Sequence, residues 1–162
     1  FLRALYASSD GILNPRTQAM GQDVFRAASV FADYPHEFTV PGTELQGPEF
    51  GLASSAALIA RANFANTLIY SKITSPAPDT GTSISFEALD LLGSHADPND
   101  LINYLDTYLL HEAMPPKMRA VLSASSALAC SRLQDGSCSN GHARAQSALY
   151  LVTTSASFNI QR

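Results

Sequence analysis

Apolar residues recur at steps of three and four along much of the chain. This spacing predicts helices, because one face of an α-helix repeats every 3.6 residues. The clearest stripes lie in residues 52–73, 98–112, 116–129 and 142–154, and a shorter pattern runs over residues 17–33. No segment alternates apolar and polar residues over more than four or five positions, so we expect no sheet beyond a two-stranded ribbon. The pattern therefore predicts an all-α fold, an irregular multi-helix bundle.

Proline and aspartate mark where several of these helices begin. Pro48 fits the first turn of the longest expected helix, about residues 48–73, because its missing N–H has no partner there in any case. In "DPND" (97–100) Asp97 is expected to cap the next helix and Pro98 to be its first residue. The stretch "TSPAPDTGTS" (74–83) is rich in Pro, Gly, Ser and Thr and reads as a linker.

Composition narrows the class of protein. The 162 residues are 46% hydrophobic and 15% charged, and this charged share is low for a soluble domain. The net charge is −4 and no Lys/Arg cluster occurs, so we expect no nucleic-acid partner. No run of about 18 apolar residues occurs, so no membrane span is expected. Residues 1–162 are taken as a single helical domain. Because "FLRALYASSDG" reads as the end of a helix, we expect the C-terminal portion of a longer parent protein.

One Pro-rich segment stands apart from the helices. "VFADYPHEFTVPGTELQGPEFG" runs from Val30 to Gly51 and holds acids, aromatics and three prolines. Proline fixes φ and lowers the entropy of the unfolded chain, so a long ordered loop is expected. Phe38 and its aromatic neighbours are expected to anchor it. The alternative is a mobile lid over an active site.

The two cysteines, Cys130 and Cys138, are close in sequence but do not form a CxxC pattern. Gly136 and the polar residues between them allow a tight turn, so we predict a disulfide. A bridge that closes a loop of this length contributes roughly 2.5 kcal/mol in the chain-entropy model. It would indicate an oxidising compartment, whereas the alternative is two free thiols in a cytosolic protein.

The candidate chemistry of the Pro-rich loop is carried by His36, Glu37 and Glu44. Paired acids serve glycoside hydrolysis only at a defined separation, which closeness in sequence does not supply. A metal site at His36 and Glu37 is disfavoured because adjacent residues rarely bind one ion together and no HExxH helix is present. We therefore expect no metal and no cofactor.

Further candidates lie on the expected helices. Asn63 and Asn66 of "NFANTLIY" could line a pocket or bond a neighbouring backbone, and Asn66 falls near the apolar stripe and is expected to be buried. His111 could act as a base, or could bond a carbonyl at its helix end. No nucleophile elbow G-x-S-x-G occurs. These residues are candidate ligand-binding groups, and no catalytic residue is assigned.

Four blocks occur in an order found in a known family: "VFADYPHEFTVPGTELQGPEF", "ANFANTLIY", "LINYLDTYLLHEAMPPKMR" and "ALYLVTTSASFNIQR". The chain resembles the C-terminal part of the bacterial proteins filed as domain of unknown function 1800, which are uncharacterised exported proteins. It departs from the family at residues 155–157, where Ser-Ala-Ser stands in place of Ser-Pro-Glu. The resemblance implies a periplasmic or secreted parent, and it implies no chemistry.

Two hypotheses from different classes follow. The first is a non-catalytic helical structural or interaction module, whose partner is the remainder of the parent chain or another exported protein. The second is part of a secreted hydrolase whose site is completed by a missing N-terminal half. A cleft that combines Glu37 or Glu44 with His36 or His111 would favour the hydrolase. Solvated and scattered acids would favour the module.

Overall fold

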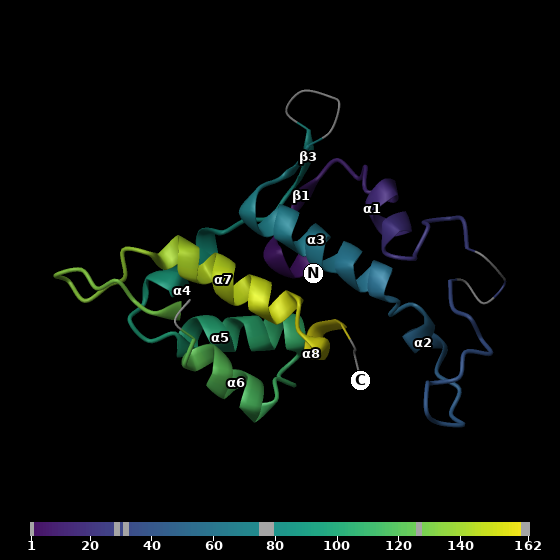
Figure 1. The fold of residues 1–162 in the computed structure, drawn as a ribbon. Coiled ribbons are helices and arrows are strands. Elements are labelled where there is room, and N and C mark those ends of the chain that lie inside the picture. Colours follow the sequence, from purple (N-terminus) through teal and green to yellow (C-terminus); the bar gives the residue numbers. More distant parts are fainter. Residues whose placement is uncertain (1, 28–29, 31–32, 75–79, 126–127, 160–162) are drawn as a thin grey trace. The chain divides into compact units, whose positions relative to one another are not determined.

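The computed structural model of the chain describes residues 2–27, 30, 33–74, 80–125 and 128–159. They form two compact units. Unit 1 comprises Phe1–Asp10 and Ala65–Arg162, and unit 2 is Gly11–Phe64. Figure 1 labels the main elements along the chain. In chain order they are η1 (Arg3–Leu5), β1 (Ser8–Ser9), α1 (Asn14–Ala19), α2 (Pro48–Gly51), α3 (Ser55–Tyr70), β2 (Ile73–Thr74), β3 (Gly81–Ser83), α4 (Glu87–Ser94), α5 (Asn99–Leu105), η2 (Asp106–Leu110), α6 (Pro116–Ser123), α7 (Gly141–Thr153) and α8 (Ala156–Asn159).

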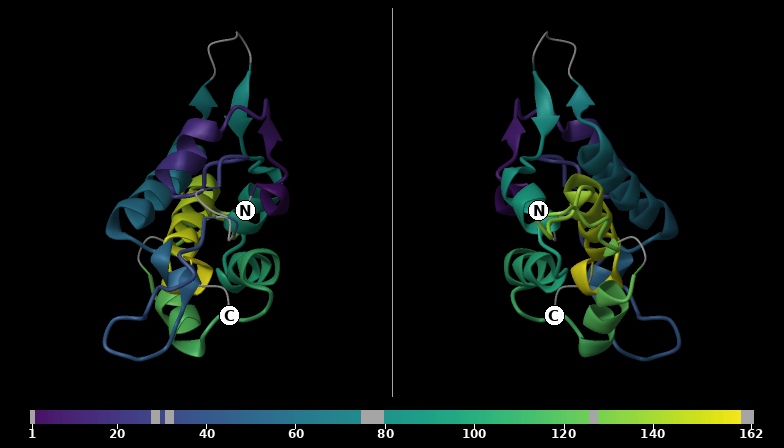
Figure 2. Two further views of the ribbon diagram at one scale, coloured as in Figure 1. Left: turned by 90° about the vertical axis from the view of Figure 1, so that its right-hand side faces the viewer. Right: turned by 90° about the vertical axis from the view of Figure 1, so that its left-hand side faces the viewer.

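The expectation of an all-α fold is wrong, because unit 1 contains a three-stranded antiparallel sheet in the order β1-β3-β2. Figure 2 shows the three strands side by side. Thr82 of β3 pairs with Ser9 on one side and with Ile73 on the other, and its hydroxyl lies 2.7 Å from that of Ser9. Strands of two or three residues are too short to show an alternating pattern. Two of them also lie at the ends of the segment 74–83 that was expected to be a linker.

The helices of unit 1 enclose one apolar core. Helix α7 packs against α4 and α5, and α6 packs against α5 (Figure 1). The core consists of Leu5, Ala65, Ile69, Leu89, Leu101, Ile102, Leu105, Leu109, Leu110, Met114, Leu122, Leu128, Ala145, Ala148, Leu149 and Val152. The expected stripe of the last helix is confirmed, since all four of its apolar positions are buried. The helices α4, α5, α6 and α7 each contribute an apolar face to this shared core, as helical spacing requires.

Two glycines allow α4 and α7 to approach closely. A Cβ on Gly93 would lie 2.3 Å from the carbonyl oxygen of Gly141. A Cβ on Gly141 would lie 2.9 Å from the amide nitrogen of Ser94. Both groups that would be struck are backbone atoms, which cannot turn away as a side chain does. Glycine is therefore required where these two helices cross.

The longest expected helix is interrupted. Residues 48–51 form α2, and a second helix, α3, starts only at Ser55. The Ser54 hydroxyl accepts a hydrogen bond from the amide of Ala57 at 3.2 Å, which is the bond of a helix N-cap. The prediction of one helix over 48–73 missed this cap. At the other end α3 stops at Tyr70, and Ile73 belongs to strand β2.

Two other expected helices are shorter than their stripes. In residues 17–33 the helix ends at Ala19, and positions 28, 29, 31 and 32 lie outside the described residues. In residues 116–129 helix α6 ends at Ser123, and Leu128 is buried from a later segment. The expected start at "DPND" is nearly right: α5 begins at Asn99, whose amide donates to the carboxylate of Asp97 at 2.9 Å.

Unit 2 is built differently from unit 1. Its Pro-rich loop folds on itself: Thr39 and Gln46 form an isolated antiparallel bridge, and the amide of Gly47 donates to the carbonyl of Phe38 at 2.9 Å. A Cβ on Gly51 would lie 2.2 Å from the Pro35 ring, so the loop and α2 touch closely. The loop thus has hydrogen-bonded local structure, whereas Phe38 is only half-buried.

The predicted cysteine pairing is confirmed by distance, since the sulfurs of Cys130 and Cys138 lie 1.98 Å apart. Between them residues 131–137 form a small hairpin, closed by the amide of Leu133, which donates to the carbonyl of Ser137 at 2.8 Å. Within the described part of the chain, no helix has both the length and the apolar character needed to cross a membrane.

Candidate functional site

The segment between α5 and α6 is held by one buried carboxylate. Asp106 opens the π-helical turn η2, accepts a hydrogen bond from the amide of Met114 at 2.9 Å, and pairs with Arg119 of α6 at 2.6 Å. His111 and Glu112 follow η2 with φ of 54° and 64°, in the left-handed region that non-glycine residues seldom adopt. Asp106 therefore fixes the turn that carries the chain from α5 into α6.

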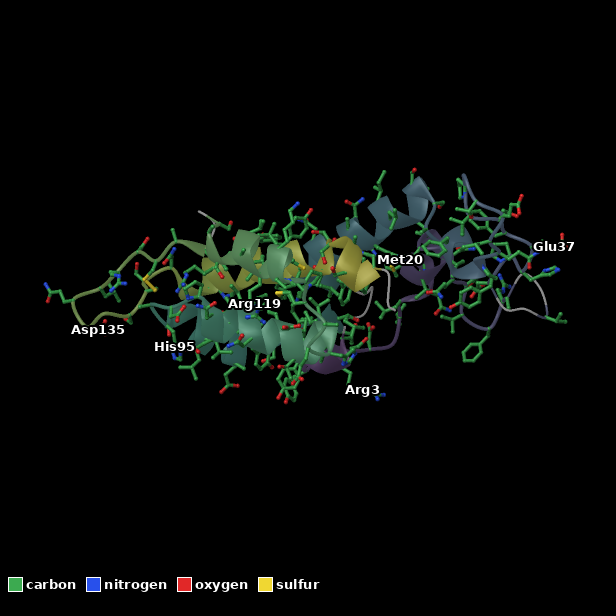
Figure 3. All side chains as sticks on the ribbon, turned by 90° about the horizontal axis from the view of Figure 1, so that it is seen from below. Arg3, Met20, Glu37, His95, Arg119 and Asp135 are labelled. Carbon is green, nitrogen blue, oxygen red and sulfur yellow. A yellow bond between two sulfur atoms is a disulfide. The ribbon has the colours of Figure 1, made fainter. Side chains whose placement is uncertain are left out.

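Helix α6 starts at a pair of prolines. Pro115 is extended and precedes the helix, and Pro116 occupies the first turn, where no N–H is needed. Figure 3 shows Arg119 on this helix, among the side chains of unit 1. Because both ends of the α5–α6 connection are fixed, the orientation of α6 in unit 1 is fixed as well.

An apolar groove lies along α6 on the side facing α7, and we call it the α6 groove. Its volume is about 450 Å³, which falls in the range typical of ligand sites. Leu122 is buried, and Val121 keeps 64% of its surface exposed. The lining residues are Pro115, Lys117, Met118, Val121, Leu122, Ser125, Leu151 and Ser155. One cation, Lys117, is therefore part of an otherwise apolar and neutral lining.

The sequence pattern pointed to this groove only in part. The stripe expected over residues 116–129 includes Met118, Val121, Leu122, Leu128 and Ala129. Leu122 and Leu128 are buried and Met118 is partly buried against the core, whereas Val121 on the short helix α6 is 64% exposed. The sequence signal that could have revealed the groove is the set of apolar residues on a short helix next to Lys117.

The sequence-derived candidates of the Pro-rich loop lie in unit 2. His36 and Glu37 are brought together, with Nε2 and Oε1 3.4 Å apart, and 84% of the Glu37 side chain is exposed. Glu44 is exposed as well. An exposed pair of neighbours of this kind is worth little energy and leaves both groups solvated.

The remaining candidates lie on helices. Asn63 and Asn66 are both exposed on α3, so the expectation that Asn66 is buried is wrong. The buried face of α3 is formed by Ala57, Ala65, Leu68 and Ile69. Asn66 is rotated away from that face, since each residue turns the helix by about 100°. His111 is exposed at the end of η2, and its amide donates to the carbonyl of Asp106.

The described residues contain no cluster of side chains that would support a metal site. Among them, no three His, Cys, Asp or Glu side chains gather closely enough to hold an ion. The α6 groove is the candidate recognition site of unit 1. A scan of the chain against family models, a search of curated proteins and a search of solved structures returned no significant match.

Proposed function

We propose that the chain is a non-catalytic interaction module that binds an apolar protein segment in the α6 groove. The observation that carries the proposal is the groove itself, with an apolar lining and a volume of about 450 Å³. Exposed apolar surface of this kind is a common feature of interaction sites, because a partner removes it from water. The partner is the remainder of the parent chain or another exported protein.

The charge of the groove lining indicates which kind of partner it favours. Lys117 is exposed in the lining of the groove, and the chain as a whole carries a net charge of −4. A local cation on an acidic protein favours an acidic group and disfavours a basic one. The occupant we propose is therefore an amphipathic segment whose apolar residues enter the groove and whose carboxylate meets Lys117.

The acids of the Pro-rich loop also favour a module over a hydrolase. A general acid in glycoside hydrolysis works at a raised pKa, which needs an apolar or crowded surrounding. Glu37 and Glu44 are instead exposed to water. No observation among the described residues favours the hydrolase.

The disulfide provides information on the compartment in which the protein acts. Disulfides persist outside the reducing cytosol, so the Cys130–Cys138 bond fits a protein of an oxidising compartment. Together with the resemblance to exported bacterial proteins, it supports a periplasmic or secreted site of action as part of this proposal.

A peptide library tests the proposal directly. Random peptides displayed on phage are selected on the folded chain and then measured against three variants. Val121→Asp places a charge in the groove, Lys117→Glu reverses its cation, and Leu91→Asp is the control. Leu91 suits this purpose because its exposed fraction, 65%, matches the 64% of Val121, and it lies on α4.

We expect the selected peptides to combine apolar residues with Asp or Glu. Val121→Asp should weaken their binding by at least about tenfold, as loss of a buried apolar contact at an interface does. Lys117→Glu should weaken acidic peptides and leave neutral ones unchanged, while Leu91→Asp should have no effect. Equal losses for Val121→Asp and Leu91→Asp, or a selection that yields no binder, would contradict the proposal.

A further inference from the structure

A buried arginine lies beside the disulfide. Arg144 has no exposed surface and is the largest of the fully buried side chains among the described residues. Its Nε donates to the carbonyl of Leu128 at 2.8 Å, and its Nη1 donates to the carbonyls of Gly93 and His95. These are dipoles and not charges, so the guanidinium is solvated by backbone in place of water.

This cation has no ionic partner in contact. None of the described carboxylates forms an ion pair with Arg144. Burial lowers the pKa of its guanidinium, and the more distant charge of Asp97 acts in the opposite direction. An arginine remains protonated under these conditions, since the guanidinium is a strong base that proteins do not deprotonate. A buried positive charge is therefore left without a neighbouring negative charge.

The nearest group able to supply that charge is a sulfur. Nη1 of Arg144 lies 2.9 Å from Sγ of Cys138. Cys138 is buried, whereas Cys130 is half-buried, so the two ends of the disulfide differ in access and in surroundings. Figure 3 shows the sulfur–sulfur bond at the base of the hairpin that carries Asp135.

We propose that the Cys130–Cys138 disulfide is a reducible site, in which an external thiol attacks Cys130 and Arg144 stabilises the departing thiolate of Cys138. The attacking thiolate forms a bond to Sγ of Cys130, the bond between Cys130 and Cys138 breaks, and its electron pair stays on Cys138. A second external thiolate then releases Cys130 as a thiolate and leaves with the first thiol as their disulfide. The chain gains two electrons, and the two external thiols lose them.

Two features of the surroundings oppose the thiolate. Burial disfavours a charge, and the carbonyl of His95, 3.2 Å from Sγ of Cys138, would accept the proton of a thiol. The same carbonyl already accepts a hydrogen bond from Arg144. A full charge in contact outweighs one peptide dipole, and burial strengthens that attraction as well, because the local dielectric is low. Thiols beside arginine accordingly titrate below the usual value.

Other ionisable side chains on the neighbouring segments are hydrogen-bonded to one another or exposed. They are His95, Asp97, Asp100, Asp90, His142, Arg132 and Asp135. Nδ1 of His95 lies 2.9 Å from Asp100, and Nδ1 of His142 lies 2.8 Å from Asp90. Arg132 and Asp135 are exposed on the hairpin. Arg144 is thus the charged group in contact with Cys138.

The hairpin also has hydrogen bonds that do not involve the sulfurs. The side chain of Asn140 accepts from the amide of Ser131 and donates to the carbonyl of Ala129. The amide of Ser139 donates to the carbonyl of Ser131, and that of Cys138 donates to the carbonyl of Ser94. Because reduction does not break these bonds directly, we expect the reduced hairpin to keep Cys138 against Arg144.

The site of attack is tested on the unaltered chain. The folded protein is exposed briefly to reduced glutathione, free thiols are alkylated, and trypsin cleaves after Arg132, which separates the two cysteines. We expect glutathione on the Cys130 peptide in at least about tenfold excess, since attack follows access and the better leaving group. Glutathione on Cys138, or on both equally, would overturn the proposal.

The role of Arg144 is tested by a matched pair of variants that both retain it. In Cys130→Ser only the Cys138 thiol remains, and in Cys138→Ser only that of Cys130. The ultraviolet absorbance of the thiolate is followed across pH, with circular dichroism as the check of folding. We expect the pKa of Cys138 to lie at least about one unit below that of Cys130, a tenfold difference in the ionisation constant. A Cys138 thiol that titrates at or above the Cys130 thiol would show that Arg144 only holds backbone carbonyls.

Discussion

The two units place their large apolar side chains in opposite ways. In unit 1, leucine, isoleucine and valine side chains from α4, α5, α6 and α7 meet in one core, and several have no exposed surface at all. In unit 2, Phe25 is 101% exposed and Ile59 is 61% exposed. Among its described residues, only Ala57 and Gly47 are buried. Both units contain apolar residues, but only unit 1 buries many of them.

The difference shows when an apolar stripe on a helix stabilises the folded state. A stripe contributes only when a second element covers it, and unit 1 supplies several such elements around α7. Unit 2 holds the helices α1 and α2, which are one or two turns long, the remainder of the Pro-rich loop, and residues 55–64 of α3. Its order comes from local hydrogen bonds and from contacts such as that between Gly51 and Pro35. Unit 1 should therefore unfold as one cooperative body, whereas unit 2 should open locally.

The largest contrast is expected from truncation of one aliphatic side chain in each unit. Leu105→Ala removes a side chain with no exposed surface and should lower the free energy of unfolding by about 2–5 kcal/mol, through lost burial and the cavity left behind. Ile59→Ala should cost less than about 0.5 kcal/mol, as a surface change does. Urea unfolding of both variants measures the two values. Equal losses would remove the distinction between the units.

A pair of glycine substitutions should show a smaller contrast. Gly93→Ala drives a Cβ into the backbone of Gly141, and overpacking of this kind costs about 1–3 kcal/mol. Gly51→Ala meets the ring of Pro35 on a loop, which can shift, so its cost should be under about 1 kcal/mol. The melting temperatures of the two variants give the comparison. A larger loss for Gly51→Ala would mean that the loop is held as firmly as the helix crossing.

The carboxylates of the two units should also differ. Asp106 is buried, receives the amide of Met114 and pairs with Arg119, so Asp106→Asn should cost about 1–3 kcal/mol. Glu37→Gln changes an exposed pair with His36 and should stay within about 0.5 kcal/mol of the unaltered chain. Chemical denaturation again supplies both numbers. An unchanged stability in Asp106→Asn would show that the turn into α6 does not depend on this carboxylate.

The smallest effect is expected at the hairpin of residues 131–137 in unit 1. This hairpin is largely exposed, as most of unit 2 is. The hydroxyl and the amide of Ser137 donate to Asp135 and lower the pKa of its carboxyl. The folded pKa lies below the unfolded one, so these bonds stabilise the hairpin above the unfolded pKa and are lost as pH falls through the folded pKa. In a carbon NMR titration, Ser137→Ala should raise the pKa of Asp135 and leave the helices intact. An unchanged titration would show that Ser137 is not the cause.

The sequence was informative where one stripe meets one core and less so elsewhere. The last helix was predicted correctly because its stripe of Ala145, Ala148, Leu149 and Val152 is buried throughout. Arg144 lies four residues before Ala148 and therefore on the same face of α7. A charged residue within an apolar stripe is the sequence signal for the buried guanidinium. The strands could not be predicted, since two or three residues carry no periodicity and pair only through tertiary contacts.

The candidate site was predictable to a smaller degree. The pairing of Cys130 and Cys138 followed from a short polar spacer with a glycine, because local geometry decides it. The α6 groove was missed because the exposure of Val121 depends on how much of α6 its neighbours cover, and a stripe does not encode that. The grouping of His36 with Glu37 was visible, but their solvation was not, since it depends on what the loop packs against.

Native-state hydrogen exchange, followed residue by residue by NMR, compares the two units most directly. Amides of α5 and α7 should exchange only through global unfolding, whereas the amides of Phe38, Val40 and Gly47 in the loop of unit 2 should exchange through local opening and be at least about a hundredfold less protected. With rising urea the protection in α5 and α7 should fall steeply and that in the loop should hardly change. Equal protection in both units, with the same dependence on urea, would show one cooperative body and contradict the distinction between them.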